Sequence, residues 1–198
     1  MKILLVGASG VLGTAVAAEL GARHDIVRAG RSGADVALDI TDANSIRAAF
    51  EKVGAVDAVV STAGKVKFAP LAALTAEDYG IGIADKLMGQ VNLVLIGQRF
   101  LAEGGSFTLT SGVLSHDPII AGSSASMVNG AIDSFVRAAA IEIAPKRINA
   151  VSPGVLTESM AGYGPFFRGH EPVPAARAAL AFSKSVEGAL TGQIFSVL

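Results

Sequence analysis

The chain has 198 residues, of which 51% are hydrophobic and 17% charged, so it can bury a large core and is not a disordered polypeptide. Its 16 basic and 17 acidic residues leave a formal net charge of −1 without a basic run, which argues against a nucleic-acid or membrane-surface partner. The absence of cysteine excludes a disulfide scaffold, thiolate catalysis and cysteine-based metal sites, and three scattered histidines show no metal-ligand spacing.

No boundary between domains is visible, because the composition does not shift and neither repeats nor low-complexity tracts occur. We therefore expect one domain over residues 1–198. The longest apolar runs have the length of a strand, and the first residues lack the form of a secretory signal. We expect a cytoplasmic protein without membrane contact.

Short apolar runs of strand character alternate with helical patterns in the first half of the chain. The continuous run 2–6 is typical of a strand buried on both faces, and Gly7 ends it. Apolar residues at helical spacing follow in 11–20 and again after Thr41. The predicted elements are, in order, strand 2–6, helix 11–20, strands 25–27 and 36–38, a helix from Thr41 to Val53, and strand 56–60.

The second half repeats this alternation. Residues 75–78 resemble a capping box that opens a long helix. The predicted elements are a helix from Thr75 to about Leu101, strand 106–109, a helix over 128–139, strand 148–151, helix 175–187 and strand 193–197. Regular alternation of strands and helices predicts a three-layer α/β fold, a doubly wound parallel sheet (Rossmann fold) of about seven strands with helices on both faces.

A glycine-rich turn lies between the first predicted strand and the first predicted helix. Glycines in this place permit a tight turn and let a pyrophosphate approach the backbone, while the free amides of the helix start bind phosphate. The alternative is a turn without a ligand. The residues that we assign to dinucleotide binding here are Gly7, Ser9, Gly10, Val11, Leu12 and Gly13.

The end of the second predicted strand indicates which dinucleotide is bound. An acidic residue there suits the free ribose hydroxyls of NAD(H), whereas an arginine suits a 2′-phosphate. Arg31 and Ser32 therefore favour NADP(H) over NAD(H), with Arg28 as a further candidate and a solvated surface arginine as the alternative. Asp39 either binds the adenine or only precedes the next helix, and the sequence does not decide between the two.

Several motifs together make the chain resemble the short-chain dehydrogenase/reductase family over nearly its whole length. The segment Arg147–Gly154, with the sequence RINAVSPG, is the most specific of them. The others are the turn Gly7–Gly13 and the segments 39–42 (DITD), 61–64 (STAG), 109–112 (LTSG), 130–138 (GAIDSFVRA) and 191–193 (TGQ).

This resemblance implies an oxidoreductase that transfers hydride between NADP(H) and a small carbonyl or alcohol substrate. It also implies a homodimer or homotetramer, in which the helices after Thr75 and around residues 128–139 pair with those of a second subunit. The further cofactor-binding residues that it implies are Asp39, Ile40, Ser61, Thr62, Ala63, Gly64, Asn129, Pro153, Gly154 and Val155.

The catalytic residues depart from the family pattern. Ser111 falls on the catalytic serine, but the catalytic tyrosine position falls on Ala125 and no Tyr-x-x-x-Lys occurs anywhere. The lysine position falls on Asn129 and the asparagine position on Lys86, so these two residues have exchanged places.

We therefore assign a reduced catalytic site to Ser111, Lys86 and Asn129. A lysine that apolar walls desolvate can donate a proton directly, because burial lowers its pKa. The alternative is a surface lysine and a serine hydroxyl without a role. His116 is a second candidate for the lost acid or a solvent-facing loop residue, and Phe166 and Phe167 either line the substrate pocket or anchor a loop.

Two other functions compete with the oxidoreductase. The missing tyrosine favours a catalytically silent NADP(H)-binding sensor or scaffold protein. A methyltransferase shares the glycine-rich turn, but it normally needs an acidic residue at the end of the second strand, and the segment 147–154 speaks against it.

Overall fold

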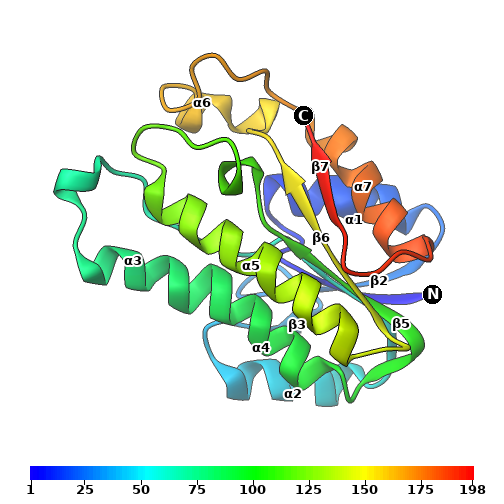
Figure 1. Cartoon of the computed structure of the whole chain (residues 1–198). Helices are drawn as coiled ribbons and strands as arrows, with labels where there is room; N and C mark the ends of the chain where they lie inside the picture. The colour runs from blue at the N-terminus through cyan, green and yellow to red at the C-terminus, as the bar shows by residue number, and fades with distance from the viewer.

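In the computed structural model, which describes residues 1–198, seven parallel strands form one sheet in the order β3-β2-β1-β4-β5-β6-β7 (Figure 1). The predicted doubly wound parallel sheet is therefore confirmed. The strands are β1 (Lys2–Val6), β2 (Asp25–Gly30), β3 (Val36–Ala37), β4 (Val56–Ser61), β5 (Leu101–Thr110), β6 (Arg147–Pro153) and β7 (Ile194–Val197).

Helices cover both faces of the sheet, because successive side chains of the buried strands point to opposite sides. Leu4 and Val6 of β1 belong to the core under α2, α4 and α5, whereas Ile3 and Leu5 face α1 and α7. The helices are α1 (Val11–Gly21), α2 (Ala43–Val53), α3 (Ala76–Gly82), α4 (Met88–Gly97), α5 (Ser123–Glu142), α6 (Met160–Tyr163) and α7 (Ala175–Glu187). None of them is long and apolar enough to cross a membrane.

The strand order reverses next to β1, which pairs with β2 on one side and with β4 on the other. In open α/β sheets, ligands bind beyond the carboxyl ends of the strands at such a reversal. The ends of β1 and β4, at Val6 and Ser61, lie side by side in the sheet. The fold therefore places the ligand crevice at the segments that follow these two residues.

The prediction of one helix from Thr75 to about Leu101 is wrong in two respects. The capping box at Thr75 and Asp78 is present, but α3 ends at Gly82 and a π-helical turn, η2 (Ile83–Leu87), separates it from α4. The helix also ends at Gly97, because Leu101 already pairs with Val56 as the first residue of β5. Helical periodicity does not report a π-turn, which shifts the register by a single residue.

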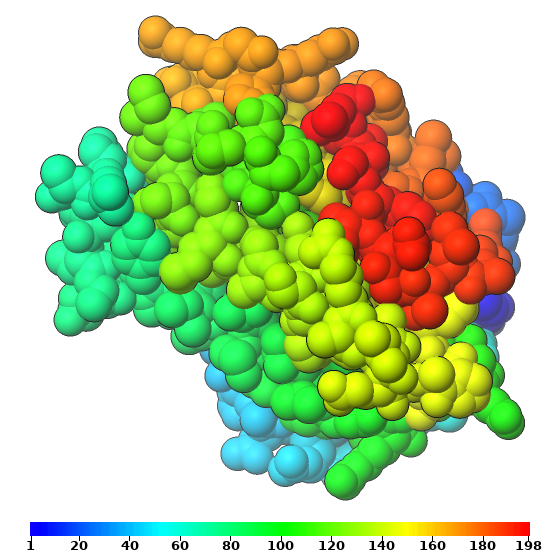
Figure 2. Space-filling view, viewed as in Figure 1, coloured from blue at the N-terminus to red at the C-terminus, as the bar shows by residue number.

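Helices α4 and α5 run side by side on the outside of the sheet, and Figure 2 shows them together on one face of the molecule. Both are apolar beyond the stripe that faces the core. Four apolar side chains on or beside them are exposed: Met88, Leu95, Met127 and Ile141.

We expect Phe50→Ala to lower the free energy of unfolding by about 3–5 kcal/mol, because a large buried side chain leaves a cavity that the core fills only in part. Phe50 is fully buried and its ring stacks on Phe100 at 5.2 Å. Urea unfolding measures the change, with Leu180→Ala on the exposed side of α7 as the control. A loss for Phe50→Ala no greater than that of the control would contradict the assigned core.

Candidate functional site

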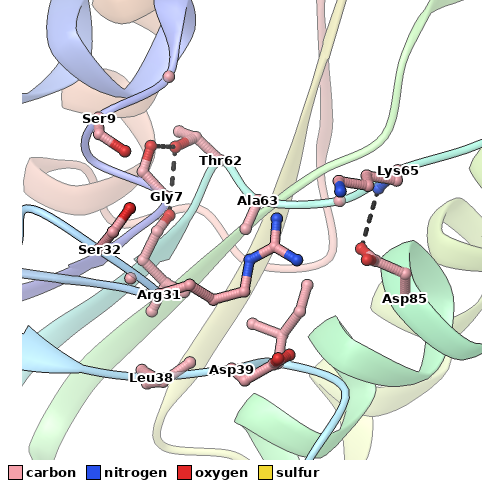
Figure 3. A pocket seen from close by; sticks show the side chains of 15 residues that line it. Gly7, Ser9, Arg31, Ser32, Leu38, Asp39, Thr62, Ala63, Lys65 and Asp85 are labelled. Carbon is pink, nitrogen blue, oxygen red and sulfur yellow. Dashed lines mark hydrogen bonds between the residues drawn. The ribbon is translucent and has the colours of Figure 1, made fainter.

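Two cavities lie at the carboxyl ends of the strands and meet at Gly64, which lines both. The first, of about 250 Å³, opens over the ends of β1, β2 and β4, and Figure 3 shows its side chains. The second, of about 220 Å³, opens over the ends of β5 and β6. The two cavities are therefore neighbours at this residue.

The glycine-rich turn forms one wall of the first cavity. Gly7 has a φ of +85°, and a Cβ there would come within 2.8 Å of the amide nitrogen of Ala63. A Cβ on Gly13 would overlap the carbonyl oxygen of Gly7. These two positions need glycine because the turn, the start of α1 and the end of β4 approach each other closely.

The start of α1 leaves its first amides free. Gly10 is the N-cap and provides no side chain, so the amides of residues 11–13 have neither a cap nor a helical acceptor. Free amides at a helix N-terminus attract a phosphate group. The free amides at the start of α1 therefore fit the pyrophosphate of a dinucleotide.

Arg31 extends into the first cavity between Ala63 and Asp39 (Figure 3). It makes no ion pair within 4.0 Å, so its guanidinium is available to a ligand. Ser32 lies next to it on the same rim. A cation and a hydroxyl at this point suit a phosphate on the adenosine ribose.

Asp39 takes part in the local structure as well as lining the cavity. Its Oδ1 accepts hydrogen bonds from the amide (2.9 Å) and the hydroxyl (2.7 Å) of Thr41. These two bonds, followed by the positive charges of Arg31 and Lys65, hold the pKa of the Asp39 carboxyl below its ordinary value. The structure shows that Asp39 supports the start of α2 and also faces the cavity.

Lys65 and Asp85 also line the first cavity, although neither was predicted from the sequence to contact a ligand. The amide of Lys65 donates to Asp85 Oδ1 at 2.9 Å, which ties the loop after β4 to the π-turn (Figure 3). The one sequence signal for Lys65 was its position directly after Gly64.

The other residues assigned to the cofactor divide by position. Ile40, Thr62, Ala63 and Gly64 line the first cavity, and Pro153, Gly154 and Val155 line the second. Ser61 is fully buried in β4, Leu12 packs into the core beneath α1, Val11 is exposed, and none of the three lines either cavity. Arg28 lies outside the first cavity, in a separate hollow beside Ser9.

The second cavity brings together the three residues assigned to catalysis. Lys86 Nζ donates to the main-chain oxygen of Ser111 at 2.8 Å and to Oδ1 of Asn129 at 2.7 Å. Three elements meet here, since Lys86 belongs to the π-turn, Ser111 follows β5 and Asn129 lies on α5. The hydroxyl of Ser111 is buried and has no hydrogen-bond partner.

Gln90 fixes the π-turn to the end of β5. Its amide nitrogen donates to the carbonyl oxygens of Lys86 (3.1 Å) and Thr110 (2.9 Å), and its Oε1 accepts from the amide of Thr110 (2.8 Å). Gln90 is fully buried, so these bonds are shielded from water. These hydrogen bonds of Gln90 fix the position of Lys86 relative to Ser111.

Burial lowers the pKa of Lys86 to about 8, and the negative charge of Asp133 opposes part of this shift. The physical cause is that the charged ammonium loses water on entering the cavity wall. A lysine whose pKa lies near neutrality suits proton transfer at physiological pH.

Neither tyrosine takes the place of the missing one on α5, where Ala125 lines the second cavity. Tyr79 lies on α3 and its hydroxyl is bonded to that of Ser123 at 2.8 Å. Tyr163 of α6 lines the second cavity. His116 is exposed and lines neither cavity.

Phe166 and Phe167 have different surroundings in the structure. Phe167 is buried and lines the second cavity. Phe166 lies outside the cavity and packs against Phe68 with ring centroids 5.7 Å apart. Of the two alternatives from the sequence, lining applies to Phe167, whereas Phe166 is exposed and is therefore not a buried loop anchor.

Comparisons with known proteins cover nearly the whole chain. A family model described as Enoyl-(Acyl carrier protein) reductase matches residues 7–197. Versicolorin reductase 1 of Dothistroma septosporum is 31% identical over 192 residues, covering 80% of this chain and 71% of that protein. The crystal structure of the protein lin1944 from Listeria innocua is 51% identical with a TM-score of 0.98, covering 100% of both chains. A small-chain dehydrogenase in complex with NADPH is 26% identical with a TM-score of 0.87, covering 100% of this chain and 96% of that one.

Because the Lys86 ammonium is buried, we expect the free energy of unfolding to depend on pH. A lysine in the unfolded chain titrates near 10.5, whereas Lys86 in the folded chain titrates at about 8. Between these pH values the unfolded state binds more protons, so the free energy of unfolding rises with pH. Relative to Lys86→Met, we expect the wild type to gain on the order of 1–3 kcal/mol from pH 7 to pH 10.

Urea unfolding of both proteins at pH 7 and pH 10 measures this difference, and titrations elsewhere in the chain cancel between them. Lys67→Met, which removes an exposed lysine of the neighbouring loop, is the control. A difference between wild type and Lys86→Met that stays constant with pH would show that Lys86 is not desolvated.

Proposed function

Because this chain belongs to the short-chain dehydrogenase/reductase family of oxidoreductases, we propose that it is an NADP(H)-dependent reductase of a small carbonyl substrate. The observation that carries the proposal is the continuous crevice through Gly64, which joins a phosphate cradle to a buried ammonium and a free hydroxyl. The NADPH complex of a related small-chain dehydrogenase supports the choice of cofactor.

Each part of the bound NADP(H) can be assigned to a group of residues that line the two cavities. We assign the pyrophosphate to the turn Gly7–Gly13, the 2′-phosphate to Arg31 and Ser32, and the adenosine to Asp39 and Ile40. The remaining assignments are Thr62, Ala63 and Gly64 along the middle of the crevice, and Asn129 with Pro153, Gly154 and Val155 around the nicotinamide riboside.

When bound, NADPH supplies the hydride for the substrate carbon. Lys86 and Ser111 act on the substrate oxygen. Two of the three N–H groups of the Lys86 ammonium are bonded within the protein, which leaves one for that oxygen. The unpaired hydroxyl of Ser111 provides a second donor. Two donors directed at a carbonyl oxygen polarise it, and Lys86 then transfers its proton as the negative charge develops.

A second function is favoured by one observation, which is that Ala125 occupies the wall where the family has its tyrosine. A protein that binds NADPH and consumes it with none of a panel of aldehydes, ketones and quinones would be the silent sensor or scaffold instead. The two functions share the cofactor site, so only turnover separates them.

We also propose that the chain forms a homodimer or homotetramer through α4 and α5. The exposed apolar residues Leu95 and Ile141 on these helices support this assembly. Sedimentation at increasing salt tests it, because an apolar interface resists salt.

We expect Arg31→Ala to weaken NADPH binding by about 10- to 100-fold, because it removes a charge-assisted contact to the 2′-phosphate. NADH lacks this phosphate, so its affinity is expected to change by less than about threefold. Titration of cofactor fluorescence measures both affinities, with Arg28→Ala in the adjacent hollow as the control. Equal wild-type affinities for NADPH and NADH would contradict the role of Arg31.

We expect Lys86→Met to slow carbonyl reduction by about 10²- to 10⁴-fold while NADPH affinity stays within about threefold, because the variant loses the proton donor but keeps the phosphate cradle. The wild-type rate should be constant below pH 8 and fall above it, as Lys86, with its pKa of about 8, loses its proton. Initial rates of NADPH oxidation between pH 6 and 10 provide the measurement. An unchanged rate in the variant rules out Lys86 as the acid.

A further inference from the structure

The walls and the floor of the second cavity differ in chemistry. Lys86, Ser111 and Asn129 form a polar floor, whereas the walls around the outer half are apolar or aromatic. The wall residues are Val66, Phe68, Leu114, Leu156, Tyr163 and Phe167. No aspartate, glutamate or arginine lines this cavity, in contrast to the first cavity, which is lined by Arg31, Asp39 and Asp85.

The aromatic part of the wall is held in place from several sides. Phe68 follows β4 in the chain, and its ring meets that of Tyr163 edge-on at 5.4 Å and that of Phe166 at 5.7 Å. The segment that carries Tyr163 is closed at its base, where Leu156 pairs with Val173. The amide of Ala175, at the start of α7, donates one bifurcated hydrogen bond to the two carboxylate oxygens of Glu158, at 3.0 and 3.1 Å. The wall is thus part of the packed structure.

The polar floor fits one uncharged oxygen atom. Lys86 has one N–H left and Ser111 has one hydroxyl, which together satisfy a single carbonyl oxygen. The cavity is lined by no second cation, and the Lys86 ammonium already uses two of its N–H groups within the protein. Burial of an incompletely paired carboxylate against apolar walls is costly, and a cationic substrate would meet the like charge of Lys86.

The size of the cavity limits the rest of the substrate. Its volume of about 220 Å³ includes the part next to Pro153, Gly154 and Val155 that we assign to the nicotinamide. An apolar protein cavity of about 150 Å³ is large enough for benzene. The whole cavity exceeds that volume by less than half, so the space beside the nicotinamide takes at most one aromatic ring.

From these contacts we propose that the substrate is an uncharged aldehyde or ketone whose carbonyl bears one aromatic ring or an alkyl group of similar volume. The proposal rests on the proposed function and specifies its substrate class. The carbonyl carbon receives the hydride, its oxygen receives the proton of Lys86, and water returns a proton to Lys86. One carbonyl compound, NADPH and one proton thus give an alcohol and NADP⁺.

Binding to the protein saturated with NADP⁺ tests this class without turnover, because NADP⁺ cannot reduce a ketone. Acetophenone and phenylglyoxylate form a matched pair in which a carboxylate replaces a methyl group, and 9-acetylanthracene adds two rings. By calorimetry we expect acetophenone to bind at least about tenfold more tightly than the other two. Tighter binding of phenylglyoxylate or of 9-acetylanthracene, or no binding of any of the three, overturns the proposal.

NADPH oxidation with the same compounds separates this proposal from the proposed function. Preferred reduction of acetophenone supports both. Preferred reduction of phenylglyoxylate leaves the reductase in place and overturns the substrate class. Binding of acetophenone without its reduction supports the proposed fit of the site to an uncharged aromatic ketone and counts against the proposed reductase activity.

Substitution in the wall tests the size limit independently. We expect Phe68→Ala to bind 2-acetylnaphthalene about tenfold more tightly relative to acetophenone than the wild type does, because the aromatic wall is opened. Phe166→Ala is the matched control, since Phe166 packs against Phe68 but lies outside the cavity. An equal change in both variants would mean that packing of the segment, and not the wall at Phe68, sets the limit.

Discussion

The buried ammonium of Lys86 is stabilised by groups from three separate elements, which must all be in position together. It bonds to the main chain after β5 and to a side chain of α5, and it is presented by the π-turn between α3 and α4. A desolvated charge is stable only where such partners are already in position. The buried clamp of Gln90 keeps β5 and the π-turn together, so the geometry of this site follows from the packing around it.

The positions of Lys86 and Asn129 determine the electrostatics of the cavity. Asn129 lies on α5 and Lys86 on the π-turn, and the ammonium donates to the amide oxygen of Asn129 at 2.7 Å. The small side chain of Ala125 lines the same cavity. The site has a single cation and no carboxylate in its lining, an arrangement that would stabilise a developing oxyanion by charge.

The two cavities form one crevice because the strand order reverses at β1. The reversal leaves the ends of β1 and β4 uncovered by a crossover helix, and Gly64 continues the path towards the end of β5. The first cavity is polar and charged, and the second is mainly apolar. One end therefore suits phosphates and ribose, and the other suits a reaction that excludes water.

The parallel sheet could be predicted from the sequence, because buried strands leave continuous apolar runs such as residues 2–6, and so could the glycine-rich turn, because Gly7 ends the first of these runs. Family motifs also indicated that Lys86, Ser111 and Asn129 belong together. The break of the long helix at the π-turn and the position of Lys65 in the first cavity became visible in the tertiary structure alone. These features arise from contacts between segments far apart in the chain, and local periodicity and spacing contain no information about such contacts.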